Sequence, residues 1–260
     1  MEHIILSKNP LKVCNKSPEI CKSSDQASLT MVMQRRELKY ILTRSQLAYL
    51  KIALKGFMEV DQYGQTSIAS LYFDTPDYRL VRTSLERPEY KEKIRLRSYG
   101  LANKDSTVYL ELKRKVTGLV YKRRISIKEE KVNYLNDCEV SEGNNQISRE
   151  IRYFCSYYQN LSPAFLIIYD RTAYFNRNSD LRLTIDESPR YRVDNLNLHT
   201  SLEGEKLLDN GGAILEIKVQ QAIPLWLTRI LSEGKIYQSS FSKVGEAYKK
   251  EMQKALERKN

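Results

Sequence analysis

Histidine is nearly absent from this chain, which has only His3 and His199 among 260 residues. Histidine is the side chain that most often serves as an acid or base near neutral pH, and it is the most common metal ligand. Because the two residues lie far apart in the sequence, neither a catalytic triad nor a histidine-ligated zinc site is expected. The chemistry of the protein should therefore depend on other side chains.

Cysteine and long apolar runs are scarce as well. No Cys-x-x-Cys pair occurs among the four cysteines, Cys14, Cys21, Cys138 and Cys155. That spacing is typical of reduced thiols in a cytosolic protein. The short run Ile4-Ile5-Leu6 is below the roughly 7–15 apolar residues of a signal peptide, and no stretch approaches the 18 or so needed to span a bilayer. We expect a cytoplasmic protein with a loosely ordered leader over residues 1–30.

Positive charge, in contrast, is abundant. Lys and Arg number 43 against 32 Asp and Glu, which gives a net charge of +11 and a pI near 9.3. Hydrophobic residues make up 41% of the chain, so a core can form, and one domain over residues 31–260 is expected. The partner of such a protein should be anionic: nucleic acid, a membrane surface or a polyphosphorylated small molecule.

Residue periodicity predicts an α+β protein. Alternation of apolar and polar residues predicts strands over residues 33–41, 66–73, 90–99, 106–116, 119–128, 164–175, 180–187 and 212–219. Helical spacing is found over residues 43–55, 76–85, 147–159, 223–231 and 243–256, with Thr43 as the expected first N-cap. Eight strands with peripheral helices favour an antiparallel sheet closed into an eight-stranded barrel.

One face of these strands is strongly basic. Because residues i, i+2 and i+4 of a strand share a face, alternation places ten cations opposite the apolar side: Lys39, Lys93, Arg95, Arg97, Lys113, Lys115, Lys122, Arg124, Arg182 and Lys218. Four acids accompany them: Glu37, Glu111, Asp186 and Glu216. An ordinary solvated sheet face is the simpler interpretation of any single strand. Like charges at i, i+2 repel, however, so six such strands together favour a multi-anionic ligand.

If the sheet closes with this face inward, the result is a basic tunnel that can hold one small ligand. Carboxylates in such a tunnel can hold a divalent metal that bridges to phosphate oxygens. The candidate metal ligands are Glu216, Glu37 and Glu111. Salt bridges to neighbouring Lys or Arg are the alternative role for these carboxylates.

Six short motifs give the chain a family resemblance. In order they are Arg36-Glu37-Leu38-Lys39-Tyr40, Ser70-Leu71-Tyr72-Phe73-Asp74-Thr75, Lys93-Ile94-Arg95-Leu96-Arg97-Ser98-Tyr99-Gly100, Leu110-Glu111-Leu112-Lys113-Arg114-Lys115, Tyr169-Asp170-Arg171-Thr172-Ala173 and Phe241-Ser242-Lys243. Over roughly residues 31–250, this series resembles VTC-type polyphosphate polymerases of the triphosphate tunnel metalloenzyme superfamily.

The resemblance implies an eight-stranded tunnel that binds triphosphate and a divalent metal, with Mn²⁺ favoured over Mg²⁺. It also implies transfer of the γ-phosphate of ATP to a growing inorganic polyphosphate chain. The residues that match phosphate-contacting positions are Lys39, Arg95, Arg97, Lys113 and Arg171. Glu216 matches the metal-binding glutamate and Lys243 a lysine at the tunnel mouth. Without the resemblance, Arg171 and Lys243 would be read as surface charges.

Together these considerations give two sets of candidate site residues. The catalytic candidates are Arg95, Arg97, Lys39 and Lys243. The triphosphate-binding candidates are Lys39, Lys93, Arg95, Arg97, Lys113, Lys115, Lys122, Arg124, Arg171, Arg182, Lys218 and Lys243. ATP and polyphosphate are the expected partners, and no specific nucleic acid is expected, because no aromatic pair was identified along a charged strand face.

Two departures from the family pattern are informative. Hydrolytic members of the superfamily typically carry Glu-x-Glu-x-Lys on the first strand, whereas here Arg35 precedes Glu37 and Lys39. Losing one carboxylate disfavours the alternative of a tunnel triphosphatase. The chain also lacks the phosphate-sensing and membrane domains of eukaryotic VTC subunits, so it is expected to act alone or with a separate membrane protein, in the latter case at the inner face of the membrane. A basic nucleic-acid-binding β-domain is the second alternative.

Overall fold

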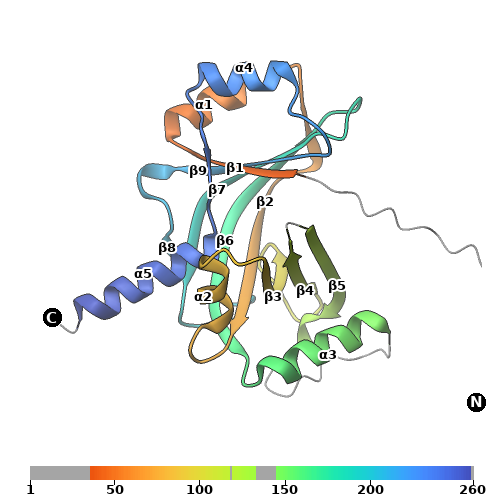
Figure 1. The fold of residues 1–260 in the computed structure, drawn as a ribbon, viewed down its shortest axis with the longest axis vertical. Coiled ribbons are helices and arrows are strands. Elements are labelled where there is room, and N and C mark those ends of the chain that lie inside the picture. The colour runs from red at the N-terminus through yellow and green to blue at the C-terminus, as the bar shows by residue number, and fades with distance from the viewer. Residues whose placement is uncertain (1–35, 118, 133–144, 259–260) are drawn as a thin grey trace, which may run out of the picture. The chain divides into compact units, whose positions relative to one another are not determined.

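The computed structural model describes residues 36–117, 119–132 and 145–258 (Figure 1). The predicted leader over residues 1–30 lies outside this range, as do Arg35 and the start of the first predicted strand. Three of the four cysteines are also outside it. Cys155 is described, and it is buried.

The described residues form one ten-stranded antiparallel sheet, which confirms the predicted α+β class. Its strands are β1 (Arg36–Leu42), β2 (Glu59–Asp74), β3 (Tyr90–Tyr99), β4 (Thr107–Val116), β5 (Leu119–Lys128), β6 (Ser162–Phe175), β7 (Arg182–Arg192), β8 (Glu205–Lys206), β9 (Ala213–Val219) and β10 (Gln238–Ser239). The strand order is β10-β1-β9-β7-β6-β2-β3-β4-β5, and β8 pairs with β7.

The backbone hydrogen bonds of the described strands do not form the closed eight-stranded barrel that the sequence predicted. Strands β5 and β10 are the two ends of the sheet, so within the described residues the ladder is open. The sheet nevertheless curls strongly. Lys113 Nζ of β4 lies 3.9 Å from Glu37 Oε2 of β1, and Lys93 Nζ of β3 lies 3.1 Å from Ser242 Oγ. Strands far apart in the sheet therefore share one interior, although no hydrogen-bonded seam joins the edges.

The observed strand limits agree with the limits predicted from alternation in strands that have one charged face and one apolar face. The predicted limits of β3 and β5 are confirmed to the residue. Strand β2 begins at Glu59, before the predicted Thr66, and β7 continues beyond Glu187 to Arg192. The two-residue strands β8 and β10 were not predicted, because two residues carry no measurable period.

Five α-helices flank the sheet, and each corresponds to a predicted one: α1 (Arg44–Ala53), α2 (Arg79–Leu85), α3 (Gln146–Tyr158), α4 (Leu225–Glu233) and α5 (Lys243–Glu257). Thr43 caps α1 as expected. Its side-chain hydroxyl accepts a hydrogen bond from the Gln46 backbone N–H, and the Gln46 side-chain oxygen accepts one from the Thr43 backbone N–H. Helix α2 begins later than predicted, after Tyr78 in left-handed backbone (φ 58°). None of the described helices is both long enough and apolar enough to cross a bilayer.

The helices pack on both faces of the sheet. On one face α3 covers β3–β5 through Ile151 and Phe154, and α1 and α4 cover β1, β7 and β9. Figure 1 shows α1 and α4 side by side, and α3 next to β5. On the other face, α2 and α5 pack through Val81 and Val244 against Ile68 and Ile167. This second packing sets the first residue of α5, Lys243, beside the charged strand faces.

Candidate functional site

The charged strand faces meet on one side of the sheet, which we call the inner face and define by Arg95, Glu111, Arg171, Asp186 and Glu216. The pairing register of the strands brings these residues together, because side chains of directly paired residues point to the same side of the sheet. Arg95 pairs with Glu111, and Arg171 pairs with Asp186. Two groups of ion pairs result, and each surrounds buried carboxylates.

The Glu111 cluster comprises Glu111, Arg95, Arg97, Lys122 and Arg124. The Glu111 side chain is only 1% exposed, and its Oε2 lies 2.8 Å from both Nε and Nη2 of Arg95. Lys122 Nζ lies 2.6 Å from Oε1, while Arg124 Nε and Arg97 Nη1 follow at 3.6 and 3.8 Å. Burial alone would raise the pKa of Glu111, but Arg95, Arg97 and Lys122 bring it down to about 2. One carboxylate therefore holds four cations together.

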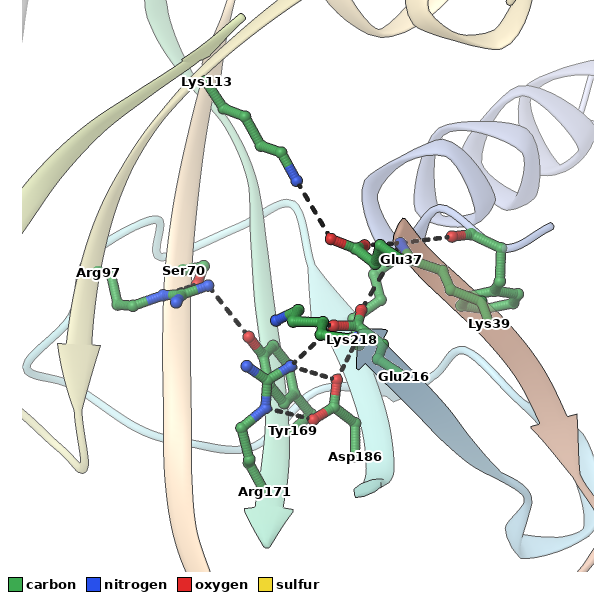
Figure 2. Close-up of polar contacts among 12 residues, drawn as sticks. Glu37, Lys39, Ser70, Arg97, Lys113, Tyr169, Arg171, Asp186, Glu216 and Lys218 are labelled. Atoms are coloured by element: carbon green, nitrogen blue, oxygen red, sulfur yellow. Dashed lines mark hydrogen bonds and ion pairs between the residues drawn. The ribbon is translucent and has the colours of Figure 1, made fainter. Parts of the chain in front are cut away.

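The Glu216 cluster comprises Glu216, Asp186, Glu37, Arg171, Lys243, Lys39 and Lys218 (most of it labelled in Figure 2). Arg171 binds Asp186 bidentately, with Nε–Oδ1 at 2.6 Å and Nη2–Oδ2 at 2.8 Å. Lys243 Nζ also donates to Asp186 and lies 3.9 Å from Glu216 Oε1. Arg171, Lys39 and Lys218 approach Glu216 within 3.7, 3.6 and 3.7 Å.

Charge balance fixes the protonation states in the Glu216 cluster. Burial opposes the ionised form of both carboxylates, yet Lys243 and Arg171 lower the pKa of Asp186. Lys243, Lys39 and Arg171 likewise hold the pKa of Glu216 well below its usual range. Burial would lower the pKa of Lys243, but Asp186 and Glu216 raise it instead. Asp186, Glu216, Lys243 and Arg171 are therefore charged at neutral pH.

Tyr169 connects the two clusters (Figure 2). Its hydroxyl accepts a 3.1 Å hydrogen bond from Arg97 Nη2, while Lys243 Nζ lies 4.5 Å from its ring centroid. Arg97 also donates to Ser70 Oγ at 3.3 Å. Arg95 Nη1 donates to the hydroxyl of Tyr72 at 2.8 Å. These hydroxyls hold the guanidinium groups of Arg95 and Arg97 in fixed directions.

The three predicted metal ligands do not form one set. Glu37 and Glu216 share Lys39, whose Nζ lies 3.3 and 3.6 Å from them, whereas Glu111 is enclosed by its own four cations. Among the described residues no group of three or more acidic, His or Cys side chains could hold a metal ion. Mg²⁺ and similar ions bind through one or two carboxylates plus substrate phosphates. Glu37 and Glu216 fit that requirement, and Glu111 does not.

The remaining predicted cations extend the inner face. Burial and the neighbouring Lys39, Lys91 and Lys113 together lower the pKa of Lys93 to about 8. Lys113 reaches Glu37, as Figure 2 shows. Lys115 pairs with Lys91 near the end of β4. Arg182 is exposed, with its guanidinium 5.3 Å from the Phe175 ring centroid, so it lies at the margin of the site.

Several residues of the site were not predicted from the sequence. Tyr72 and Ser70 were detectable, because they alternate with the buried Leu71 and Phe73. Tyr169 follows a continuously buried run, so alternation could not assign its face. Alternation along single strands also could not reveal an aromatic pair that forms between neighbouring strands. Tyr99 continues the Arg95–Arg97 face, and Tyr109, which pairs with Arg97, lies 5.8 Å from it between ring centroids.

Solved structures resemble the fold. A candidate adenylate cyclase from Bacillus halodurans matches with a TM-score of 0.52 and 12% identity, covering 81% of this chain and 96% of that one. A candidate adenylate cyclase from Vibrio parahaemolyticus matches with a TM-score of 0.44 and 12% identity, over 82% of this chain and 97% of that one. At such identity, the first match shows a shared fold and nothing more. No curated protein sequence matches the chain.

The family is identified by a sequence model rather than by these structures. The VTC domain model matches residues 34–252, which contain every residue of the two clusters. This match supports a function in handling triphosphate or other phosphoryl groups. The chain belongs to the VTC domain family.

Proposed function

We propose that the protein is a polyphosphate polymerase that transfers the γ-phosphate of ATP to a growing inorganic polyphosphate chain. The observation that carries this proposal is the convergence of enclosed cations on the inner face. The side chains of Arg97, Lys243 and Arg171 are only 8, 12 and 18% exposed. Cations this enclosed suit a narrow, linear polyanion, whereas nucleic acid needs an open basic surface.

Positioning of the reactants is the main task of this site. Arg95 and Arg97 grip the triphosphate through planar guanidinium groups, which suit bidentate contact with phosphate oxygens. Their directions are fixed beforehand by Glu111, Tyr72 and Tyr169. Lys243 and Arg171 lie across from them and neutralise charge on the same phosphates.

In the transfer step, a terminal phosphate oxygen of the chain attacks the γ-phosphorus of ATP and a new P–O bond forms. The bond between the γ-phosphorus and the β,γ-bridging oxygen breaks, ADP leaves with the electron pair, and the chain gains one phosphate. The attacking oxygen is already ionised near neutral pH, since the second pKa of a phosphate ester is about 6. No protein base is required, which agrees with the scarcity of histidine.

Glu37 and Glu216 are the residues that would hold a divalent cation, Mn²⁺ or Mg²⁺. When bound there, such an ion would supply further neutralisation of developing negative charge. The sequence Arg35-x-Glu37-x-Lys39 has one carboxylate fewer than the first strand of hydrolytic tunnel enzymes. We therefore favour transfer to a phosphate chain over hydrolysis.

A polyphosphate-stained gel separates transfer from hydrolysis. Purified protein is incubated with ATP and Mn²⁺, and the products are run beside a free-phosphate assay. The proposal predicts a polymer ladder with ADP as the co-product. Free phosphate without polymer would identify a triphosphatase, and consumption of neither ATP nor triphosphate would contradict both.

A further inference from the structure

The inner face of β3–β5 changes its chemistry along the strands. Toward one end, β3 carries Lys91 and Lys93 and β4 carries Lys113 and Lys115, while Val120 of β5 pairs with Lys115. The middle carries the Glu111 cluster. Toward the other end, the same alternation brings Tyr99 and Tyr109 onto the face. A strand rises roughly 3.3 Å per residue, so Tyr99 lies about 7 Å beyond Arg97 along β3.

Tyr99 presents a fixed but accessible ring. The residue is 49% exposed, although the neighbouring Arg97 side chain is only 8% exposed. Its hydroxyl accepts a 3.2 Å hydrogen bond from Arg124 Nη2, and its ring meets Tyr109 edge-on, with an interplanar angle of 78°. The Arg124 guanidinium carbon lies 5.8 Å from the centroid of the Tyr99 ring, and about half of the residue remains exposed and available for stacking.

Arg124 links this aromatic end to the phosphate-binding middle. Its guanidinium carbon lies 3.6 Å from the Tyr109 ring centroid, which is a stacked contact. Its Nε faces Glu111 Oε1 at 3.6 Å, and the Nε is buried without a hydrogen-bond partner among the described residues. The ledge formed by Tyr99, Tyr109 and Arg124 is thus continuous with the Glu111 cluster.

We propose that this ledge is the nucleobase subsite of the phosphoryl donor, with the base stacked on Tyr99 and the triphosphate running past Arg97 and Arg95 toward Lys93. The assignment rests on the proposed function for the identity of the donor. It adds a direction to the site: the nucleoside lies at the tyrosine end, and the growing phosphate chain lies on the lysine side.

The chemistry of the two ends supports this direction. Lysines attract phosphate but offer no planar surface, so the lysine end suits the polymer. Aromatic rings stack with any base, and stacking is worth roughly five-fold to a hundred-fold in affinity per base. Because Tyr99 is held in place before the ligand arrives, little entropy is lost when a base stacks on it. Stacking also predicts weak discrimination between adenine and guanine.

Calorimetric binding of two ligands tests the subsite. The β,γ-imido analogue of ATP carries a base and is not transferred, while inorganic tripolyphosphate has the phosphates alone. Both are titrated, with Mn²⁺ present, into the wild type, Tyr99→Ala, Tyr99→Phe and the control Tyr153→Ala. Tyr153 is 68% exposed on α3, which packs on the opposite face of the sheet.

In Tyr99→Ala, the Kd of the ATP analogue should rise about ten-fold, while that of tripolyphosphate stays within two-fold of the wild type. Tyr99→Phe should retain most of the affinity, because the ring remains. Equal losses for both ligands, or no loss for either, would overturn the subsite. If the proposed function were wrong but the subsite correct, the wild-type protein would bind both ligands and still make no polymer.

Discussion

The Glu111 and Glu216 clusters face each other across one interior, yet they are built differently. In the Glu111 cluster four cations surround a single carboxylate, which leaves three positive charges uncompensated. In the Glu216 cluster Arg171, Lys243, Lys39 and Lys218 accompany three carboxylates, so only one positive charge remains. The same alternation of charged residues along strands therefore produces two distinct electrostatic environments.

The difference in net charge suggests separate roles for the two clusters, phosphate binding for one and metal binding for the other. A strongly positive group suits direct contact with phosphate oxygens, whereas a nearly balanced group, in which Glu37 and Glu216 share a lysine, suits a cation bound together with phosphate. Under the proposed function, Glu111 holds Arg95, Arg97 and Lys122 in place, and Glu216 would bind the metal. Four measurements on variants of the two clusters and of Lys93 can test this division.

Replacing Arg95 by Ala should have the largest effect. The variant loses a guanidinium that contacts both Glu111 and the proposed triphosphate, and removal of one such preorganised group typically lowers the rate by about 10²–10³-fold. Polymer synthesis should fall by that factor while circular dichroism stays unchanged. The control is Arg177→Ala, a surface residue 73% exposed and paired with Glu59. Wild-type synthesis by a folded Arg95→Ala protein would refute the role of Arg95.

Glu216→Gln and Glu111→Gln separate the two carboxylates by their metal dependence. Glu216→Gln should raise the Mn²⁺ concentration needed for half-maximal activity by about ten-fold or more, because one of two oxygen ligands loses its charge. Glu111→Gln should lower activity without moving the Mn²⁺ requirement. The measurement is a Mn²⁺ titration of polymer synthesis for both variants. If Glu111→Gln shifted the requirement as much, the division of labour would be wrong.

Stability at low pH provides an independent measure of Glu111. Its pKa lies at about 2 instead of the ordinary 4.5, so the folded state favours the ionised form. Because the pKa of Glu111 is lower in the folded state than in the unfolded state, ionised Glu111 stabilises the folded protein. This stabilisation is complete above pH 4.5 and is lost as the pH falls toward 2. Such a shift corresponds to roughly 3 kcal/mol of unfolding free energy. Urea unfolding should show Glu111→Gln less stable by about that amount at pH 7, and the difference should shrink by pH 3.

Titration of Lys93 should have the smallest effect, a change in the affinity for tripolyphosphate with pH. Burial and neighbouring lysines place its pKa at about 8, so its positive charge is lost as the pH rises from 7 to 9. The affinity for tripolyphosphate should fall a few-fold over that range. Lys93→Arg should flatten the profile, because a guanidinium stays protonated.

Tyr72 is a second group to control in that experiment. Burial would raise its pKa, but Arg95, Lys93 and Arg97 bring it to about 8, so its ionisation also makes the face less positive above pH 8. Tyr72→Phe isolates the contribution of Lys93. A flat profile in Tyr72→Phe, or a profile in Lys93→Arg as steep as that of the wild type, would show that Lys93 does not face the ligand.

Local alternation was enough to predict much of the site. The limits of β3 and β5 and the inward set of Arg95, Arg97 and Glu111 follow from period two alone, because one face of these strands is charged and the other apolar. Thr43 was predictable as a cap because capping depends on only four consecutive residues. These features are all determined by neighbours in the sequence.

Features that depend on distant strands could not be predicted in this way. Whether the sheet closes depends on the twist accumulated over all strands, and the predicted barrel was in fact an open, curled sheet. Which carboxylates lie together depends on the same curl, so the separate enclosure of Glu111 by four cations did not follow from the alternation. Arg171 and Lys243 were found only through the family resemblance, since neither lies in a strand segment with clear alternation.

The central claim is that the inner face transfers a phosphoryl group to a phosphate chain, and the fate of the γ-phosphate tests it most directly. Protein incubated with γ-³²P-labelled ATP and Mn²⁺ is assayed for ADP, free phosphate and labelled polymer. The account predicts that the label enters a polymer ladder with one phosphate incorporated for each ADP released. Recovery of the label as free phosphate, in equal amount to ADP and without polymer, would contradict it.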